Sequence, residues 1–540
     1  MQQGPEVTSA RGAVAIGPDE AARIGARILA RGGNAMDAAA ATAMACCMLR
    51  PDMTGVGGYG LCAMVLERES GRVWCLDANA RAPAAAHERM FDVASLANGA
   101  QTGHAINRAE YACRVTDDAN VHGPLAVGVP GMMAGMGTLW ERWGCLTWPD
   151  IVEPSLALLG AGFPYGSVAH AIGSLQDVIR RFPASAEHLM PDGKLPEKDD
   201  TWHRPDMEKT LARLAEAGWR DFYQGELGRT IADYLQSAGG ILTREDMARY
   251  EPRVAEPLTT TYRGATVHGS ILSNGGLTSL QVLNMLECFP PAEDNSVGYW
   301  HLLAEILKLA WRDRLIYLAD SESVDVPVHS LLSKGYAAGR VEAIRQMPAH
   351  VDRRAPDLLT DATGGTVHLS TADADGNLVA ATITQGGAFG SCVTVPGTGI
   401  ILGHAMCRLD PRPGRANSIA PRKRPLNNMA PMIVCLPNRD VAVGLPGGRR
   451  IISVAAQLVQ RIVDYGAGGY DAAAAPRMHV EFKEPVQLTE SAGDDVIQAL
   501  RQMGHDIEAV RAVAGAAHCA EWLRDMKTIR AGGNDGAAAP

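Results

Sequence analysis

The sequence lacks several features that would place it in other classes of protein. No linker rich in proline and serine and no block of like charges divides its 540 residues. With 46% apolar and 20% charged residues, the composition is typical of a globular protein with a large core. No uncharged apolar run reaches the roughly 18 residues that a membrane-spanning helix needs, so no membrane partner is expected. Residues 1–6 have neither the basic nor the apolar stretch of a signal peptide, and we therefore expect a cytoplasmic protein.

Net positive charge and metal-binding patterns are also missing. The formal net charge of −10 argues against nucleic acid as a partner, because polyanion binding needs a basic face. Eleven cysteines are scattered singly, apart from Cys46–Cys47, without a CxxC pair or a spaced His/Cys set. This pattern favours reduced thiols over disulfides, and no metal site is expected. The glycine-rich loop at residues 55–60 lacks the surroundings of a dinucleotide site, so we expect no cofactor.

Short strands alternate with helices along the chain, which predicts a layered α/β protein. One helix is expected over residues 18–31, with acidic residues in its first turn and a stop at Gly32–Gly33. Residues 35–49 are nearly all alanine, methionine and cysteine, so a second helix there must be buried on most faces. A long helix is expected over residues 297–319. The tail at residues 530–540, rich in glycine and alanine, is expected to be disordered.

A β-hairpin is predicted in the second half of the chain. Residues 366–373 and 378–384 are rich in β-branched side chains, and a turn containing Asp375, Gly376 and Asn377 separates them. The first strand opens on Thr366, directly after Gly364–Gly365. A threonine at a strand start is ordinary by itself. A second glycine pair, Gly447–Gly448, follows about eighty residues later. This combination favours a functional role for Thr366 over that of an ordinary strand residue.

Six further motifs occur in a fixed order along nearly the whole chain. They are residues 32–39 (GGNAMDAA), 54–60 (TGVGGYG), 123–131 (GPLAVGVPG), 238–243 (AGGILT), 324–328 (VDVPV) and 396–402 (PGTGIIL). Each alone is weak, but the ordered set is very specific. Together with Gly365–Thr366 and Gly447–Gly448, it resembles the γ-glutamyltransferase family of the N-terminal-nucleophile hydrolases, which includes the related cephalosporin (glutaryl) acylases.

This resemblance implies a fold and a processing step. Family members are four-layer αββα sandwiches, in which two central antiparallel sheets lie between helical layers. They cut themselves before a threonine, which here matches the bond between Gly365 and Thr366. The expected products are a large chain, residues 1–365, and a small chain, residues 366–540. Together they would form a single catalytic unit, as a heterodimer or a dimer of heterodimers.

The resemblance also implies catalytic roles for four residues. Thr366 would be the nucleophile, and its freed amine the base. Thr384 matches the threonine that orients the nucleophile; the alternative is a threonine that serves only strand propensity. Gly447 and Gly448 match the pair whose N–H groups form an oxyanion hole.

The expected acyl pocket departs from the family pattern. Asn79 stands where γ-glutamyl enzymes carry an arginine for the substrate α-carboxylate, with Arg81 two residues later. Asn427–Asn428 replaces a serine pair. Gly386 and Arg408 replace the asparagine and the acidic residue that bind the α-ammonium. A charge pair at 4 Å is worth about 4 kcal/mol at an effective dielectric of 20, so the change to Arg408 turns attraction into repulsion of similar size. Arg408 could instead point into solvent with the basic residues that follow it.

Three functions remain open from the sequence. The first is a self-processing amide hydrolase or acyltransferase for a small-molecule amide with a non-zwitterionic, dicarboxylic-type acyl group, with water or an amine as acceptor. The second is an ordinary γ-glutamyl transferase or glutathione hydrolase. The third is a catalytically silent binding protein, which the presence of Thr366, Thr384 and Gly447–Gly448 disfavours.

Overall fold

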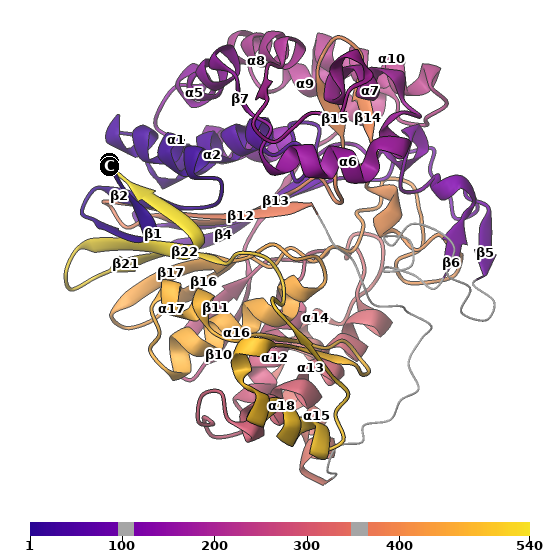
Figure 1. The fold of residues 1–540 in the computed structure, drawn as a ribbon. Coiled ribbons are helices and arrows are strands. Elements are labelled where there is room, and N and C mark those ends of the chain that lie inside the picture. Colours follow the sequence, from indigo (N-terminus) through magenta and orange to yellow (C-terminus); the bar gives the residue numbers. More distant parts are fainter. Residues whose placement is uncertain (96–112, 347–364) are drawn as a thin grey trace.

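The chain folds into four layers, in which two layers of strands lie between two layers of helices (Figure 1). The computed structural model describes residues 1–95, 113–346 and 365–540. Helices from the first half of the chain cover one side, and helices from the second half cover the other. The αββα sandwich expected from the sequence is therefore confirmed.

All the long strands belong to one hydrogen-bonded sheet, and every pairing in it is antiparallel. Their order across the sheet is β10 (Leu258–Tyr262), β11 (Ala265–Gly269), β16 (Met432–Cys435), β17 (Arg439–Gly444), β21 (His518–Leu523), β22 (Thr528–Ala539), β2 (Gly12–Ala15), β12 (Thr366–Asp373), β13 (Leu378–Thr384), β3 (Gly60–Glu67), β4 (Arg72–Asn79) and β9 (Arg253–Ala255), with β1 (Gln2–Ser9) added against β22.

The sheet doubles back on itself, so that its two ends form the two inner layers. β12 and β13 pack face to face on β17 and β21. The core between them consists largely of small side chains, such as Ala13, Ala380 and Ala520, which allow the two sheet layers to approach closely. One chain path thus supplies both sheets of the sandwich.

The first helical layer covers β2, β3, β12 and β13. It contains α1 (Asp19–Ala30), α2 (Ala35–Leu49), α4 (Met132–Trp143), α5 (Trp148–Ala161), α6 (Ser167–Ile179), α7 (Pro183–Leu189), α8 (Pro205–Ala217), α9 (Asp221–Gln224), α10 (Glu226–Ser237) and α11 (Arg244–Ala248). The two predicted N-terminal helices are confirmed as α1 and α2. Every residue of α2 from Ala35 to Met48 is buried, as its composition predicts.

The second helical layer covers the other end of the sheet. It contains α12 (Gly276–Leu286), α13 (Val297–Tyr317), α14 (Val328–Leu332), α15 (Lys334–Gln346), α16 (Arg450–Asp464), α17 (Gly469–Ala474) and α18 (Asp494–Gln502). The predicted long helix is α13. Among the described residues, none of the helices has both the length and the apolar character needed to cross a membrane.

Four small sheets complete the part of the fold that the structure describes. They pair β14 (Val393–Val395) with β15 (Ile400–Leu402), β5 (Val93–Ser95) with β6 (Cys113–Val115), β7 (Phe163–Pro164) with β8 (Thr201–Trp202), and β19 (Val486–Thr489) with both β18 (Met478–His479) and β20 (Ile507–Val510).

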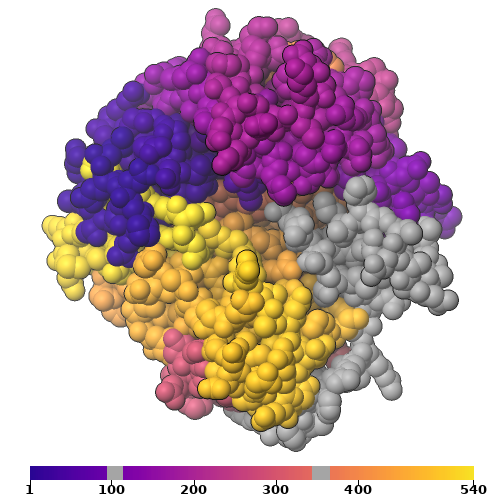
Figure 2. Space-filling model, viewed as in Figure 1, coloured from indigo at the N-terminus to yellow at the C-terminus, as the bar shows by residue number. Residues whose placement is uncertain are grey.

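The C-terminal tail is a strand, and the expectation of disorder there was wrong. β22 extends to Ala539 and pairs with β1, β2 and β21. Figure 2 accordingly shows the N-terminal and C-terminal residues side by side on one face. Glycine and alanine give this strand little intrinsic preference, but their small size suits the thin layer between the sheets.

Candidate active site

The predicted nucleophile lies at the start of a central strand, opposite the threonine predicted to orient it. Thr366 begins β12 and Thr384 ends β13, and the two residues face each other across the predicted hairpin. Their Oγ1 atoms are 2.9 Å apart, and both side chains are buried. Opposite residues of an antiparallel pair share one face of the sheet, so the hairpin register itself creates this contact.

Thr384 links Thr366 to the peptide bond that precedes it. The Thr384 hydroxyl donates to the carbonyl oxygen of Gly365 and accepts from the N–H of Gly386 at 2.9 Å. Since a hydroxyl has one hydrogen, the Thr366 hydroxyl must be the donor in the contact between the two threonines. A Cβ on residue 365 would lie 2.7 Å from the carbonyl oxygen of Asp52, so the chain can pass here only as glycine.

Thr366 opens into a very small space. The pocket measures about 20 Å³, so it has room for about one water molecule. The described residues that line it include no histidine, cysteine or carboxylate, the side chains that hold most protein metals. They are Tyr59, Thr366, Thr384, Gly386, Arg408, Asn427, Asn428, Met429, Gly448 and Ile451.

Arg408 lies in this lining and does not extend into solvent. Its side chain is 7% exposed, and its Nη2 donates to the carbonyl oxygen of Gly386 at 2.8 Å. Burial and the charge of Arg408 lower the pKa of the nearby His404 to about 3. That histidine is therefore neutral near pH 7 and a poor general base, and the pocket carries the positive charge of Arg408 beside the threonine pair.

The asparagines predicted to bind substrate take different places. Asn427 and Asn428 both line the pocket. Asn79 is fully buried and outside the described lining, where it donates to Asn274 at 2.8 Å. Asn274 also accepts from Asn427, at 2.9 Å. Asn79 therefore supports the wall that Asn427 forms.

Arg81 is not brought to the Thr366 pocket. Its Nη2 lies 2.7 Å from the carboxylate of Glu322. Arg253 and Arg424 contact the same carboxylate. Arg81 thus belongs to a partly exposed group of ion pairs.

The second glycine pair follows a different strand, and one of its two residues lies in the same pocket. Gly447 and Gly448 follow β17 and precede α16, with φ angles of +141° and +61°. Gly448 lines the pocket, and a Cβ on Gly447 would lie 2.6 Å from that of Ala514. Within the described part of the chain, no hydrogen bond uses the N–H of either glycine. The Gly448 N–H is therefore a backbone donor without a partner in the pocket of the predicted nucleophile, and the Gly447 N–H is a second such donor next to it in the chain.

A buried ion pair holds the residue that follows this loop. Arg449 contacts the carboxylate of Glu481 through Nε at 2.6 Å and Nη2 at 2.5 Å. Burial alone would raise the pKa of Glu481, but the charge and hydrogen bonds of Arg449, together with those of His479, outweigh it and hold that pKa at about 2. The pair therefore fixes the start of α16 and the end of the glycine loop.

We expect Glu481→Gln to lower the free energy of unfolding at pH 7 by about 3 kcal/mol, because it removes the charge of a buried carboxylate that Arg449 contacts through two nitrogens. The folded-state pKa of Glu481 is below its ordinary value of 4.5. The stabilisation is therefore present above pH 4.5 and is lost as the pH falls towards 2. Denaturant unfolding at several pH values measures this difference. Glu256→Gln is the matched control, since its pair with Arg72 is exposed, and it should change stability by less than about 0.5 kcal/mol.

A second, larger cavity shares one lining residue with the Thr366 pocket. It measures about 300 Å³, and Asn428 lines both spaces. Its described lining carries four arginines, Arg314, Arg412, Arg415 and Arg449, and a single carboxylate, that of Asp410. Two of these arginines already have a carboxylate partner, Arg412 in Asp410 and Arg449 in Glu481.

Sequence reasoning missed three residues that shape the site. Tyr59 lines the pocket and lies in the TGVGGYG motif, which was the available signal. Arg314 donates to the side chain of Asn428 at 3.1 Å, and Asn274 joins Asn79 to Asn427. Neither of these two lies in a recognisable motif.

Comparisons with known proteins agree with this geometry. The family model for gamma-glutamyltranspeptidase matches residues 21–537. The Acylase ACY 1 proenzyme of Pseudomonas sp. (strain SE83) is 35% identical, over 94% of this chain and 89% of that protein. The glutathione hydrolase proenzyme of Bacillus subtilis (strain 168) is 32% identical, over 92% of this chain and 85% of that protein.

Solved structures of related enzymes are also similar to this chain. The crystal structure of cephalosporin acylase from Bacillus halodurans has a TM-score of 0.87 and 27% identity, covering 100% of this chain and 98% of that one. The gamma-glutamyltranspeptidase of Helicobacter pylori has a TM-score of 0.56 and 27% identity, covering 64% and 96% of the two chains. The chain therefore belongs to the gamma-glutamyltranspeptidase family and is an enzyme of the N-terminal-nucleophile hydrolase class.

Proposed function

We propose that the chain cuts itself between Gly365 and Thr366 and then cleaves amides through an acyl-threonine intermediate. The observation that carries this proposal is the contact of Thr366 with Thr384 in the pocket that both line, where Thr384 also donates to the Gly365 carbonyl oxygen. The products would be residues 1–365 and residues 366–540, held together as a heterodimer.

The hydroxyl groups of Thr366 and Thr384 would carry out the cut at the Gly365–Thr366 peptide bond. The Thr366 Oγ1 attacks the Gly365 carbonyl carbon, while the Thr384 hydroxyl, which donates to that carbonyl oxygen, stabilises the negative charge that develops. The C–N bond then breaks, the nitrogen takes up the hydroxyl proton, and the new ester is opened by water. The small chain then begins with a free α-amine, whose pKa near 8 suits a base close to neutral pH.

The cut also frees a hydrogen bond for catalysis. Once the Gly365 carboxylate leaves, the Thr384 hydroxyl can donate to Thr366 Oγ1 instead. The amine of Thr366 takes the hydroxyl proton as Oγ1 attacks the substrate carbonyl carbon, and the N–H groups of Gly447 and Gly448 bind the resulting oxyanion. The amide C–N bond breaks, the leaving amine takes the proton, and water or another amine releases the acyl group.

The charges of the site favour an acyl group that bears a carboxylate and no ammonium. Arg408 lies in the pocket lining, and four arginines line the cavity beyond Asn428. A substrate α-ammonium would meet repulsion from Arg408, whereas a carboxylate would be attracted. An ordinary γ-glutamyl or glutathione hydrolase is the second candidate, because relatives of that name match most of the chain.

We therefore expect the wild-type enzyme to prefer glutaryl-p-nitroanilide over γ-glutamyl-p-nitroanilide. Arg408→Asp should shift the ratio of the two kcat/KM values towards the γ-glutamyl donor by about 1–3 kcal/mol, because it replaces repulsion of the ammonium by attraction. Release of p-nitroaniline measures both rates.

Arg422→Asp is the matched control. It makes the same change of charge at an exposed residue of the same basic segment, and the donor ratio should stay unchanged. An unchanged ratio in Arg408→Asp would refute the role of Arg408. A wild-type preference for the γ-glutamyl donor would favour the second candidate function.

A further inference from the structure

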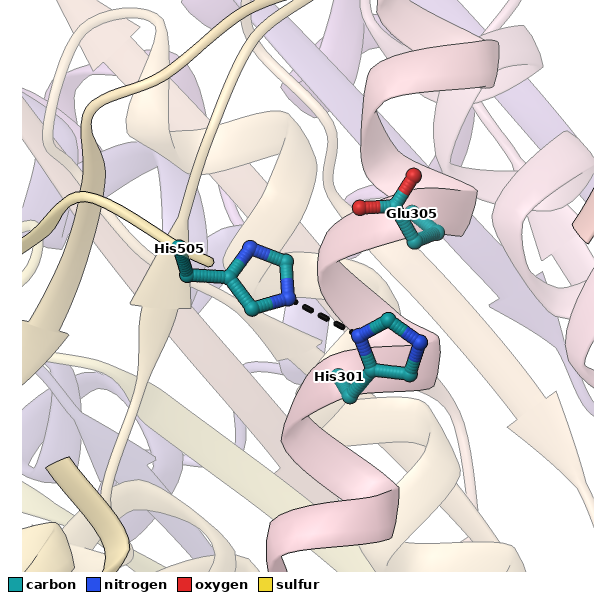
Figure 3. Close-up of side chains that lie close together, drawn as sticks. All are labelled: His301, Glu305 and His505. Carbon is teal, nitrogen blue, oxygen red and sulfur yellow. Dashed lines mark hydrogen bonds between the residues drawn. The ribbon is translucent and has the colours of Figure 1, made fainter. Parts of the chain in front are cut away.

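A group of potential metal ligands lies outside the site described above, where α13 meets the C-terminal part of the chain (Figure 3). His301 and Glu305 are one turn apart on α13, so they share a face of the helix. His505 lies in the turn after α18. One ligand atom from each of the three residues lies within 4.8 Å of the others, and His301 Nδ1 is 2.8 Å from His505 Nε2.

The hydrogen bonds of His505 determine which of its nitrogens carries a lone pair. His505 Nδ1 lies 2.9 Å from Oε1 of Glu484, and an ionised carboxylate can only accept. Nδ1 therefore carries the proton, and the lone pair of Nε2 points at His301. A carboxylate that holds a histidine in this way is the usual second layer of support around a metal-binding histidine.

The two carboxylates of the group share one ammonium. Lys308 Nζ lies 2.8 Å from Glu305 and 2.6 Å from Glu484. Among the described residues, Oε2 of Glu305 and Oε2 of Glu484 are buried without a hydrogen-bond donor. Carboxylate oxygens that are buried without a donor are costly unless a cation lies beside them.

We propose that His301, Glu305 and His505 bind a divalent transition-metal ion, with zinc as the best match for two imidazoles and one carboxylate. His301 would change tautomer, so that its Nδ1 lone pair joins that of His505 Nε2. At bond lengths of about 2.0–2.1 Å, tetrahedral ligand atoms lie about 3.3 Å apart. The two nitrogens must therefore separate by about half an ångström, and Glu305 must turn inwards. His301 is partly exposed and provides the entry path.

The ligands come from both sides of the bond between Gly365 and Thr366. His301 and Glu305 precede it, and His505 follows it. If the chain is cut as proposed, the ion would join the large and small chains, so its role is structural. Binding itself does not depend on the cut.

The first test removes metal with a chelator, adds ZnCl₂ or CoCl₂, and measures bound metal by mass spectrometry. We expect one ion per 540 residues, a rise in Tm, and for Co²⁺ the visible absorption of a tetrahedral site. His301→Ala should lose this ion, and Glu484→Gln should weaken binding by about 10–100-fold. His329→Ala, which changes an exposed histidine on α14, should bind like the wild type.

His301→Asn provides a second variant in case His301→Ala does not fold. Equal metal content in the wild type and both His301 variants would overturn the proposal. Thr366→Ala should bind the ion as the wild type does, because the ligands are present in the uncut chain. A failure to cut therefore leaves the metal test intact, and a failure to bind metal leaves the proposed cut intact.

Discussion

Thr366→Ala should leave the purified protein as a single uncut chain with no amidase activity. The variant lacks the hydroxyl that attacks the Gly365 carbonyl carbon, and without the cut no free amine forms. The wild type should show two bands on a denaturing gel, and N-terminal sequencing of the smaller one should begin Thr366-Val367-His368-Leu369. Activity should fall to the background rate.

Two further variants sharpen this result. Thr366→Ser keeps a hydroxyl and should still be cut, although more slowly. Thr384→Val keeps the shape but removes the hydroxyl that donates to Gly365, so its cut should also slow. Full activity in a wild-type chain that stays uncut would refute the proposed mechanism.

Gly448→Ala should lower kcat by about 10² or more with little change in KM. The Gly448 N–H is proposed to bind charge that develops only in the transition state, where one donor is worth about 3 kcal/mol. A side chain at φ +61° in the pocket lining would displace that N–H. Steady-state kinetics with the preferred p-nitroanilide measure the effect.

Gly466→Ala separates this effect from backbone strain. Gly466 has a similar φ of +66°, and a Cβ there meets nothing within 4 Å. Its substitution should cost about 1 kcal/mol of stability and leave kcat unchanged. If Gly448→Ala changed only KM, Gly448 would not be an oxyanion donor.

The hairpin and the N-terminal helices could be predicted because their signals are local. Alternation of β-branched residues, a turn with glycine and asparagine, and a helix stop at Gly32 each act within a few residues. β22 could not be predicted in this way. Its glycine- and alanine-rich sequence becomes a strand only because β1, β2 and β21 offer partners that are far away in the sequence.

The lining of the Thr366 pocket was harder to predict, because it too depends on partners that are distant in the sequence. The motifs gave the positions of Asn79 and Arg81 but not the direction of their side chains. Asn274 and Glu322 draw those side chains away from the Thr366 pocket, and neither partner stands out in the sequence. The three-dimensional environment therefore leaves Asn427, Asn428, Arg408 and the unpredicted Tyr59 in the described lining.

The order of strands in the sheet has a consequence for how the enzyme must be made. Within the described chain, five strand pairings join residues before Thr366 to residues from Thr366 onwards: β1 with β22, β2 with β22, β2 with β12, β3 with β13, and β11 with β16. Neither half can complete its sheet without the other. If the chain is cut as proposed, folding must therefore come before cutting. Once the two halves are unfolded and separated, the shared sheet can form again only if they meet and fold together.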